Sequence, residues 1–267
     1  MKIIQPNAIE LIQGAGFHGM LQHIEYCGRT CYKSEDKITE DSCYRFVNML
    51  REHAHGAMLE HGTVYLTIPT YNNRDNEGKI LEAKIIFLLR NKYTKYNEAF
   101  NNYYITTNYR VIVENGWEDI MQKFQSECTE YHYKRKTFKI TCNRGVSHEF
   151  VRHRVFSFAQ ESQRYVNYSK EKFENEIKVI KPLYFEEGTQ KFDIWKSSCE
   201  NAESDYFCLL NNRATPQEAR EVLPNSTATE LIMTGFESDW EHFFDLRCAK
   251  DAHPQAQEIA NMIKEQF

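Results

Sequence analysis

Cationic and polar side chains are concentrated in one short string, RHRVFSFAQESQRY, at residues 152–165. Arg152, Arg154 and Arg164 supply guanidinium groups, and Ser162 lies among them. A guanidinium binds phosphate or carboxylate oxygens through two parallel hydrogen bonds, and a serine hydroxyl adds a neutral donor. The string therefore indicates a site for an anion, such as a phosphorylated small molecule or a cofactor with a pyrophosphate.

An ion-pair network within the protein would explain the same charges equally well. Residues 145–158 have the pattern of a helix, in which Arg152 and Arg154 would point about 200° apart and could not share one solvent-facing side. At least one guanidinium would then be buried, where an unpaired charge is costly. Glu149 is spaced to pair with Arg152 or His153 along such a helix. An ion-pair network and an anion site both fit these residues.

The overall charge restricts the choice of anion. The 267 residues carry 33 basic and 38 acidic side chains, a net charge of -5, so the whole chain has no electrostatic attraction for nucleic acid or for an anionic membrane. Single-stranded RNA is an alternative ligand, since aromatic residues near the arginines could stack on bases. These aromatic residues are Phe156, Phe158, Tyr165 and Tyr168. The lack of a wider basic stripe favours a small anion over RNA.

The cysteines and the first residues indicate a cytoplasmic protein with no membrane partner. The eight cysteines form no CxxC pairs, which is typical of reduced thiols, and the sequence has neither a signal-peptide pattern nor an apolar run long enough to cross a membrane. His23, Cys27 and Cys31 would share one face of a helix. A fourth metal ligand is not evident, so we expect packing there and no metal site.

The pattern of apolar residues predicts a single α+β domain over residues 1–267, with helices flanking a central sheet. Helices are expected at residues 21–32, 39–55, 145–158, 192–212, 215–224, 238–247 and 254–267, and strands at 62–70 and 135–141. Thr39, Thr215 and Ser238 are the expected N-caps. From residue 71 to about 136 the composition shifts to Asn, Tyr and Lys, and we interpret this segment as a β-rich insertion with a strand pair at 103–116.

The string GAGFHG at residues 14–19 matches the glycine pattern GxGxxG. A dinucleotide-binding fold would need a second parallel strand that ends in an acidic residue about twenty positions later. Two helical patterns follow instead, so we expect a turn before a helix. A nicotinamide-dependent dehydrogenase built on this loop is a further alternative.

Several motifs together resemble those of the flavin-dependent thymidylate synthases. Arg152, His153 and Arg154, followed after seven residues by Ser162, resemble the RHR-seven-residues-Ser signature, and SQRY continues the likeness. GRTCYKS, LEHGTVYLTI, AREVLP and HFFDLR with the following AHPQAQEIA are also similar to the family's motifs. The resemblance covers nearly the whole chain except residues 71–136.

This resemblance implies an activity and its cofactors. The family converts dUMP to dTMP with methylenetetrahydrofolate as one-carbon donor and with FAD that NADPH has reduced. It forms homotetramers whose active sites are shared between subunits, on an α+β fold with a helix-flanked sheet. No cysteine follows a proline, as the nucleophile of the classical thymidylate synthases does, so a cysteine nucleophile is not indicated.

The resemblance also implies site residues. Arg247 matches an arginine that stabilises the ionised uracil ring, which makes it the expected catalytic residue. The dUMP contacts that it implies are Glu149, Arg152, Gln160, Glu161, Ser162, Gln163, Arg164, Arg220 and Arg247. The FAD contacts that it implies are His61, Thr63, Arg152, His153, Arg154, Gln160 and His242. Glu149 and Gln160 depart from the family pattern, which has Gln and Glu there, and the family's Asn-x-Arg flavin contacts are absent at residues 236–238.

Overall fold

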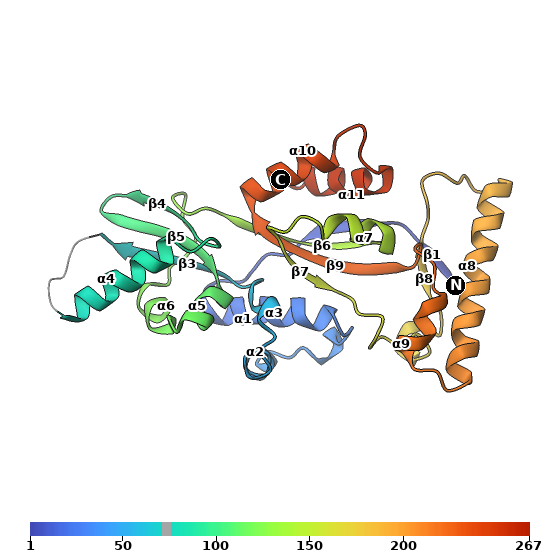
Figure 1. Ribbon diagram of the computed structural model, residues 1–267, viewed down its shortest axis with the longest axis horizontal. Coiled ribbons are helices and arrows are strands. Elements are labelled where there is room, and N and C mark those ends of the chain that lie inside the picture. The colour runs from blue at the N-terminus through green and yellow to red at the C-terminus, as the bar shows by residue number, and fades with distance from the viewer. Residues whose placement is uncertain (71–75) are drawn as a thin grey trace.

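The computed structural model describes residues 1–70 and 76–267, with side chains except at 76–80 and 172 (Figure 1). Within these residues, three separate sheets form the framework of an elongated molecule. A three-stranded sheet lies toward one end, a four-stranded sheet lies in the middle, and the long helix α8 (Gln190–Asn211) stands at the other end. In the described part of the chain, no helix combines the length and apolar character needed to cross a membrane.

The four-stranded sheet is antiparallel and has the order β2-β6-β9-β7. Its strands are β2 (Asn7–Glu10), β6 (Arg135–Asn143), β9 (Ala228–Phe236) and β7 (Ser157–Gln160). The two central strands β6 and β9 pair along their whole length, from Arg135 opposite Phe236 to Asn143 opposite Ala228. The strand expected at residues 135–141 is therefore confirmed.

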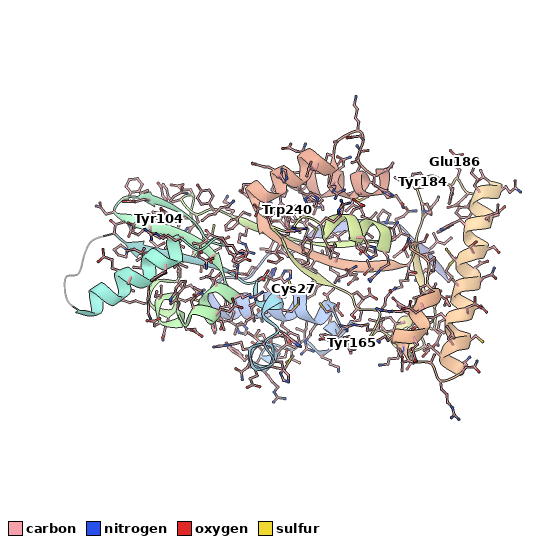
Figure 2. All side chains as sticks on the ribbon, viewed as in Figure 1. Cys27, Tyr104, Tyr165, Tyr184, Glu186 and Trp240 are labelled. Atoms are coloured by element: carbon pink, nitrogen blue, oxygen red, sulfur yellow. The ribbon has the colours of Figure 1, made fainter. Side chains whose placement is uncertain are left out.

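Helices cover both faces of this sheet. α7 (Arg144–Phe150), α10 (Glu237–Arg247) and α11 (Pro254–Lys264) pack on one face, and α1 (Gly16–Thr30) and α3 (Gly56–Leu59) on the other. Phe138 and Ile140 of β6 are fully buried with Trp240 of α10, because alternate side chains of a strand point to the same face. Figure 2 shows Trp240 and Cys27 on opposite sides of the sheet. The expected α+β fold with a helix-flanked sheet is confirmed.

The three-stranded sheet joins an expected strand to the segment interpreted as an insertion. β3 (Thr63–Pro69) pairs with β5 (Asn102–Asn108), which pairs with β4 (Lys95–Ala99). Helices α4 (Asn76–Leu89), α5 (Tyr109–Asn115), α6 (Glu118–Phe124) and α2 (Ser42–Glu52) contribute side chains to the apolar core that this sheet shares. Residues 71–75 of the segment lie outside the described part of the chain.

The strand pair expected at residues 103–116 is wrong in its second half. Residues 109–115 form helix α5, because the Asn108 side chain accepts a hydrogen bond from the Val111 amide and caps the helix. Gly116 ends it with a left-handed φ of 65°. The hairpin partner of β5 is β4, which precedes it, and Phe100 and Asn101 turn the chain with positive φ angles.

The expected helix over residues 145–158 is also wrong beyond residue 150. Asn143 caps α7 through a bond from the Val146 amide, and the helix ends at Phe150. A turn over residues 151–156 follows, and Ser157–Gln160 then pair with β9. The pairing with a distant strand outweighs the local helical pattern. Arg152 and Arg154 therefore lie in an exposed turn, and the burial predicted for one of them does not occur.

The region around α8 follows the expected pattern. Its remaining elements are the parallel pair β1 (Lys2–Ile4) and β8 (Lys178–Ile180), helix α9 (Pro216–Ala219), and the 3-10 turns η2 (Glu171–Phe173) and η3 (Arg220–Val222). Thr215 and Glu218 form the expected capping box of α9.

Two other expected caps are wrong. Thr39 does not cap α2: its amide donates a hydrogen bond to the Ser42 hydroxyl, and the helix begins at Ser42. The 3-10 turn η1 (Glu35–Lys37) precedes it. α10 begins one residue before Ser238, because Asp239 accepts a bond from the Phe236 amide.

The glycine loop is a turn before a helix, as expected. β2 is antiparallel to β6, which excludes the parallel strands of a dinucleotide-binding fold at this position. Gly14 and Gly19 touch so closely that a Cβ on Gly19 would lie 2.3 Å from the Gly14 backbone. The glycines thus permit a close approach between the loop and the first turn of α1.

A buried chain of hydrogen bonds ties the four-stranded sheet to α1 and to His61, two residues before β3. The ring of His23 bonds Thr137 at 3.2 Å, Thr137 bonds Thr234 at 2.8 Å, and Thr234 bonds the ring of His61 at 2.8 Å. Burial, with a contribution from the nearby Arg135 charge, lowers the pKa of His23 to about 4. Burial lowers the pKa of His61 to about 3. Both rings are therefore neutral in the folded protein at neutral pH.

We predict that the free energy of unfolding decreases as the pH falls from about 6.5 toward 4. In the unfolded chain, His23 and His61 bind protons near the usual histidine pKa of about 6.5, whereas in the folded chain their pKa values are much lower. At pH 5 this difference lowers the free energy of unfolding by about 2 kcal/mol per histidine. Urea unfolding at pH 7.5 and pH 5 measures this difference. His23→Gln should reduce the pH dependence, and His55→Gln, at an exposed position, should leave it unchanged.

Candidate active site

Most of the predicted nucleotide contacts line one pocket of about 410 Å³, here called the arginine pocket. Its lining residues are Cys31, Tyr32, Arg144, Gln160, Glu161, Ser162, Gln163, Arg164, Tyr165 and Arg220. Figure 2 shows Tyr165 between the end of α1 and α9. The pocket thus brings together the loop after β7, the start of α7 and the turn η3.

Backbone and side-chain bonds fix the floor of the arginine pocket. The Ser162 amide donates to the Cys31 carbonyl at 3.0 Å, which fastens the loop after β7 to the end of α1. The Arg144 guanidinium donates to Thr229 Oγ1 at 3.1 Å and to the Glu161 carbonyl at 3.3 Å. Gln160 Nε2 donates to Ser147 Oγ at 2.9 Å. The loop is therefore held on both sides before any ligand binds.

The charges in the arginine pocket favour an anion. Arg144, Arg164 and Arg220 bring three guanidinium groups to it, against one carboxyl group, that of Glu161. Glu161 is only 6 % exposed and accepts a bond from the Tyr168 hydroxyl at 3.2 Å. Burial raises the pKa of Glu161, which favours its neutral form. The pocket therefore has an excess of positive charge suited to a phosphate group.

Arg247 is at the centre of a second group, the Arg247 cluster, formed with Glu149 and His153. Its guanidinium donates to Glu149 Oε2 at 2.9 Å, to the Glu149 carbonyl at 2.7 Å and to His153 Nε2 at 2.9 Å. Burial and the Arg247 charge lower the pKa of His153 to about 4, so its Nε2 is a neutral acceptor. The hydrogen bond from Arg247 lowers the pKa of Glu149. His242 is exposed nearby on α10.

Arg152 and Arg154 project from the turn between α7 and β7. The Arg152 side chain is 70 % exposed and makes only a long contact of 3.3 Å with Glu149. Arg154 is exposed and forms no ion pair with any described residue. Val155, 60 % exposed, lies beside them. The turn presents cations and an apolar side chain together, which suits an anionic ligand with an aromatic ring system or a second protein surface.

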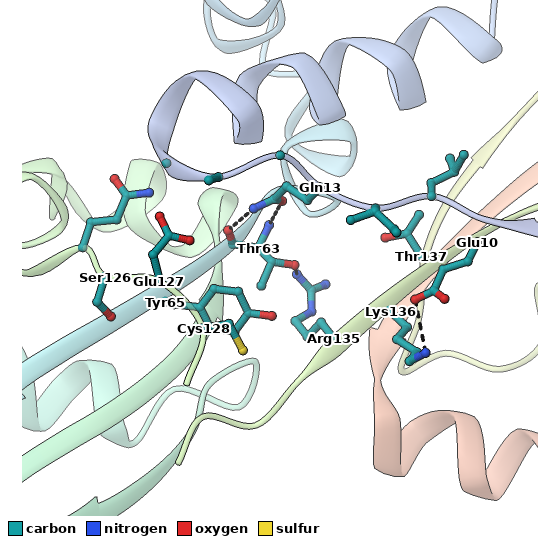
Figure 3. Close-up of a pocket in the computed structure, with 16 residues that line it drawn as sticks. Glu10, Gln13, Thr63, Tyr65, Ser126, Glu127, Cys128, Arg135, Lys136 and Thr137 are labelled. Carbon is teal, nitrogen blue, oxygen red and sulfur yellow. Dashed lines mark hydrogen bonds and ion pairs between the residues drawn. The ribbon is translucent and has the colours of Figure 1, made fainter. Parts of the chain in front are cut away.

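The remaining two predicted residues lie elsewhere. His61 is 0 % exposed, and its Nδ1 is bonded to Thr234, so no atom of it reaches the surface of this chain. Thr63 lines a different cavity, between the two larger sheets (Figure 3). Along α7, the arginine pocket at Arg144 and the cluster at Glu149 are about 8 Å apart. Within a single chain, the predicted contacts therefore form several separate groups and not one site.

Four residues that line the arginine pocket were not among the predicted nucleotide contacts, namely Cys31, Tyr32, Arg144 and Tyr165. The aromatic surface was overestimated. Cys31 and Tyr32 line the arginine pocket, and the GRTCYKS likeness was the only sequence signal for them. Phe156 and Tyr168 are buried in the cores, and Tyr165 is exposed. The stacking surface proposed for single-stranded RNA is therefore largely absent among these aromatic residues.

Comparison with known proteins agrees with the motifs. The sequence model of a family described as thymidylate synthase complementing protein matches residues 132–267, just over half of the chain. A flavin-dependent thymidylate synthase of Mycolicibacterium gilvum is 31 % identical over 140 residues, which cover 46 % of this chain and 54 % of the relative. The enzyme of that name from Pyrococcus furiosus is 28 % identical over 164 residues, or 60 % and 66 % of the two chains. This chain thus spans about half to two thirds of these relatives.

A solved structure also resembles the chain at low similarity. The crystal structure of a UMP/dUMP methylase from Streptomyces cacaoi, bound with 5-Br dUMP, matches at 16 % identity with a TM-score of 0.45. The match covers 100 % of this chain and 91 % of the other, and the assignment does not depend on it. From the family match over residues 132–267, the chain belongs to the thymidylate synthase complementing protein family, the family of flavin-dependent thymidylate synthases that its motifs indicated.

Proposed function

We propose that the chain is an FAD-dependent thymidylate synthase. It would convert dUMP to dTMP with methylenetetrahydrofolate as one-carbon donor and NADPH as reductant, in the cytoplasm and without a cysteine nucleophile. The single observation that carries the proposal is the arginine pocket, in which motif residues 160–164 converge with Arg220 around a cationic space of nucleotide size. The flavin-dependent relatives and the family match support the same activity.

The arginine pocket is the proposed dUMP site. Arg164 and Arg220 would bind the phosphate, with Ser162 as a neutral donor, because a phosphate suits bidentate guanidinium groups. Gln160, Glu161 and Gln163 complete its wall beside the nucleotide. Ser162 is assigned to binding, since no general base contacts its hydroxyl among the described residues.

The exposed turn after α7 is the proposed flavin-binding surface. The residues present fit an anionic cofactor, because Arg154 is an exposed cation with no ion pair among the described residues, and Arg152 is 70 % exposed and paired only with Glu149 at 3.3 Å. His153, Gln160, His242 and Thr63 would complete the contacts. His61 would not touch the cofactor, because it is buried; its role would be to hold Thr234 in place through their hydrogen bond. When bound, FAD would supply the hydride that completes the methyl group.

Arg247 is the proposed catalytic residue. A fixed cation beside the uracil ring stabilises negative charge that develops when the ring's imide proton is withdrawn. The bonds to Glu149 and His153 hold the guanidinium in one orientation. Because Glu149 is ionised and bonded to it, part of the Arg247 charge is already neutralised, and an incoming anionic ring would compete with Glu149.

The thiol in the arginine pocket supports a mechanism without a cysteine nucleophile. Cys31 lines the pocket and lies 3.8 Å from the Met58 sulfur. Burial raises the pKa of Cys31, so its thiol stays protonated at neutral pH. Because the thiolate is the nucleophilic form, Cys31 is a poor nucleophile.

We further propose a homotetramer with active sites shared between subunits. The arginine pocket and the Arg247 cluster lie at opposite ends of α7, and Thr63 lines a separate cavity. In a symmetric assembly, the Arg247 cluster of one chain can lie against the arginine pocket of another. The exposed apolar side chain of Val155, two residues after His153, favours such a contact between chains. One complete site would then combine residues from more than one subunit.

Arg247→Ala is predicted to lower turnover of dUMP by about two to three orders of magnitude, because it removes charge stabilisation from the reacting ring. Flavin absorbance should largely remain, since Arg152 and Arg154, the cations of the proposed flavin surface, form no hydrogen bond or ion pair with Arg247 among the described residues. Steady-state kinetics with a parallel absorbance spectrum measure both. Arg45→Ala, at an exposed position on α2, is the matched control. Full activity in Arg247→Ala would contradict the catalytic role.

Mixing two inactive variants tests the shared site. If Arg164 and Arg247 act on one nucleotide from different subunits, tetramers assembled from Arg164→Ala and Arg247→Ala chains should regain about a quarter of the wild-type sites. Co-expression with two affinity tags isolates the mixed tetramers for assay. Zero activity in tetramers that contain both chains would indicate that each site belongs to one subunit.

A further inference from the structure

A cavity of about 270 Å³ lies between the two larger sheets, apart from the arginine pocket, and is here called the intersheet cavity. One wall is the loop of residues 10–16, which leads into α1, and another is formed by Thr63, Tyr65 and Arg135 (Figure 3). Residues 125–128, from the segment interpreted as an insertion, close it. Apart from Thr63, none of these residues belongs to the proposed synthase site.

Arg135 is the only cation in the intersheet cavity without a carboxylate partner among the described residues. Its guanidinium donates to Thr63 Oγ1 at 3.2 Å and to the Glu60 carbonyl at 3.0 Å, and both acceptors are neutral. The Glu60 carboxylate is bonded instead to Arg110 at 2.7 Å. Burial lowers the pKa of Arg135 to about 10, so the group is still charged at neutral pH. The carboxylates of Glu60 and Asp239 lie near enough to favour the charged form of Arg135, but they pair with Arg110 and Lys95 and form no ion pair with Arg135 among the described residues. A buried cation whose bonded partners are neutral is stabilised further by a bound anion.

The rest of the cavity wall carries neutral polar groups. Tyr65, Gln125 and Ser126 also line the cavity. Figure 3 shows the Tyr65 ring between Arg135 and Ser126. Gln13 fastens the loop to β3 by two bonds with the Thr63 backbone, at 2.9 and 2.8 Å, so this wall is fixed. One guanidinium together with neutral polar groups elsewhere on the cavity wall suits a tetrahedral oxyanion with three free oxygens better than a planar carboxylate.

The carboxylates that line the cavity do not prevent an anion from binding. Glu10 is paired with Lys136 at 3.2 Å, which neutralises both groups. Glu127 is exposed, and Figure 3 shows it on the side of the cavity formed by residues 125–128. Glu127 would repel an anion weakly, because solvent screens an exposed charge.

We propose that the intersheet cavity binds the phosphate group of a phosphorylated small molecule, with the Arg135 guanidinium as its counter-charge. This site does not depend on the proposed synthase activity. The phosphate has two conceivable sources, the pyrophosphate of a bound dinucleotide cofactor or a separate phosphorylated metabolite. Both have the same chemistry at Arg135, and the experiment below separates them.

Cys128 offers a direct probe, because it lines the cavity and is exposed, while Cys208 is an exposed thiol on α8 far from it. Alkylation of each cysteine in the full-length protein would be followed by mass spectrometry, with inorganic phosphate or pyrophosphate added at constant ionic strength. We expect Cys128 to react about tenfold more slowly at ten times the dissociation constant. Cys208 should react at an unchanged rate.

Two variants test the charge at the site. Arg135→Gln should abolish the protection of Cys128. Glu127→Gln removes a negative charge at an exposed position and should lower the half-saturating phosphate concentration about two- to fivefold. An unprotected Cys128 in the wild type, equal slowing of Cys208, or weaker phosphate binding in Glu127→Gln would overturn the proposal, even if Arg135→Gln does not fold.

Adding FAD in the same experiment distinguishes the two sources of the phosphate. If FAD protects Cys128 and pyrophosphate displaces FAD absorbance from the protein, the cavity binds the cofactor's own phosphates. If pyrophosphate protects Cys128 while FAD remains bound, the cavity binds a separate metabolite. Either result supports the site, and the synthase proposal is judged separately by its turnover of dUMP.

Discussion

The pairing of β6 with β9 is the constraint on which the functional groups of the chain depend. The two strands run antiparallel in full register from Arg135 opposite Phe236 to Asn143 opposite Ala228. At one end, Asn143 caps α7 and directs Arg144 into the arginine pocket. At the other end, α10 starts after Phe236 and leads to Arg247. A slip of one residue would turn every side chain of a strand to the opposite face and separate these groups.

The arginines of the chain meet three different environments, and each environment indicates a different role. Arg247 is bonded to Glu149 and His153, which gives it a fixed orientation. Arg152 and Arg154 are exposed, so they are available to a ligand or to a neighbouring subunit. Arg135 is desolvated and donates to neutral acceptors, so a bound anion would supply a direct counter-charge. Physical chemistry thus separates residues that look alike in the sequence.

Local patterns were sufficient to predict several elements. The alternation of apolar residues in β3 and β6 and the Thr215 capping box of α9 identified structure correctly, because near neighbours in the chain determine those features. The motif residues 160–164 and Arg220 were also expected to lie together, and they line one pocket.

Long-range contacts explain what could not be predicted. Residues 157–160 form a strand only because β9 lies beside them, more than sixty residues later. The bond between Arg247 and Glu149 joins residues 98 positions apart, and no local spacing indicates it. Arg135 opens a strand in an apparently solvent-exposed Arg-Lys pair, and its desolvation depends on residues 60–63 and 125–128 folding over it.

The most direct test of the proposed synthase is an absorbance spectrum of the purified protein, followed under anaerobic conditions by addition of NADPH with and without dUMP. If flavin and nucleotide share one site, the protein shows flavin absorbance bands, and these bands bleach faster when dUMP is present. A colourless protein that cannot be reconstituted with FAD, or flavin bands that bleach at the same rate without dUMP, would contradict the shared site.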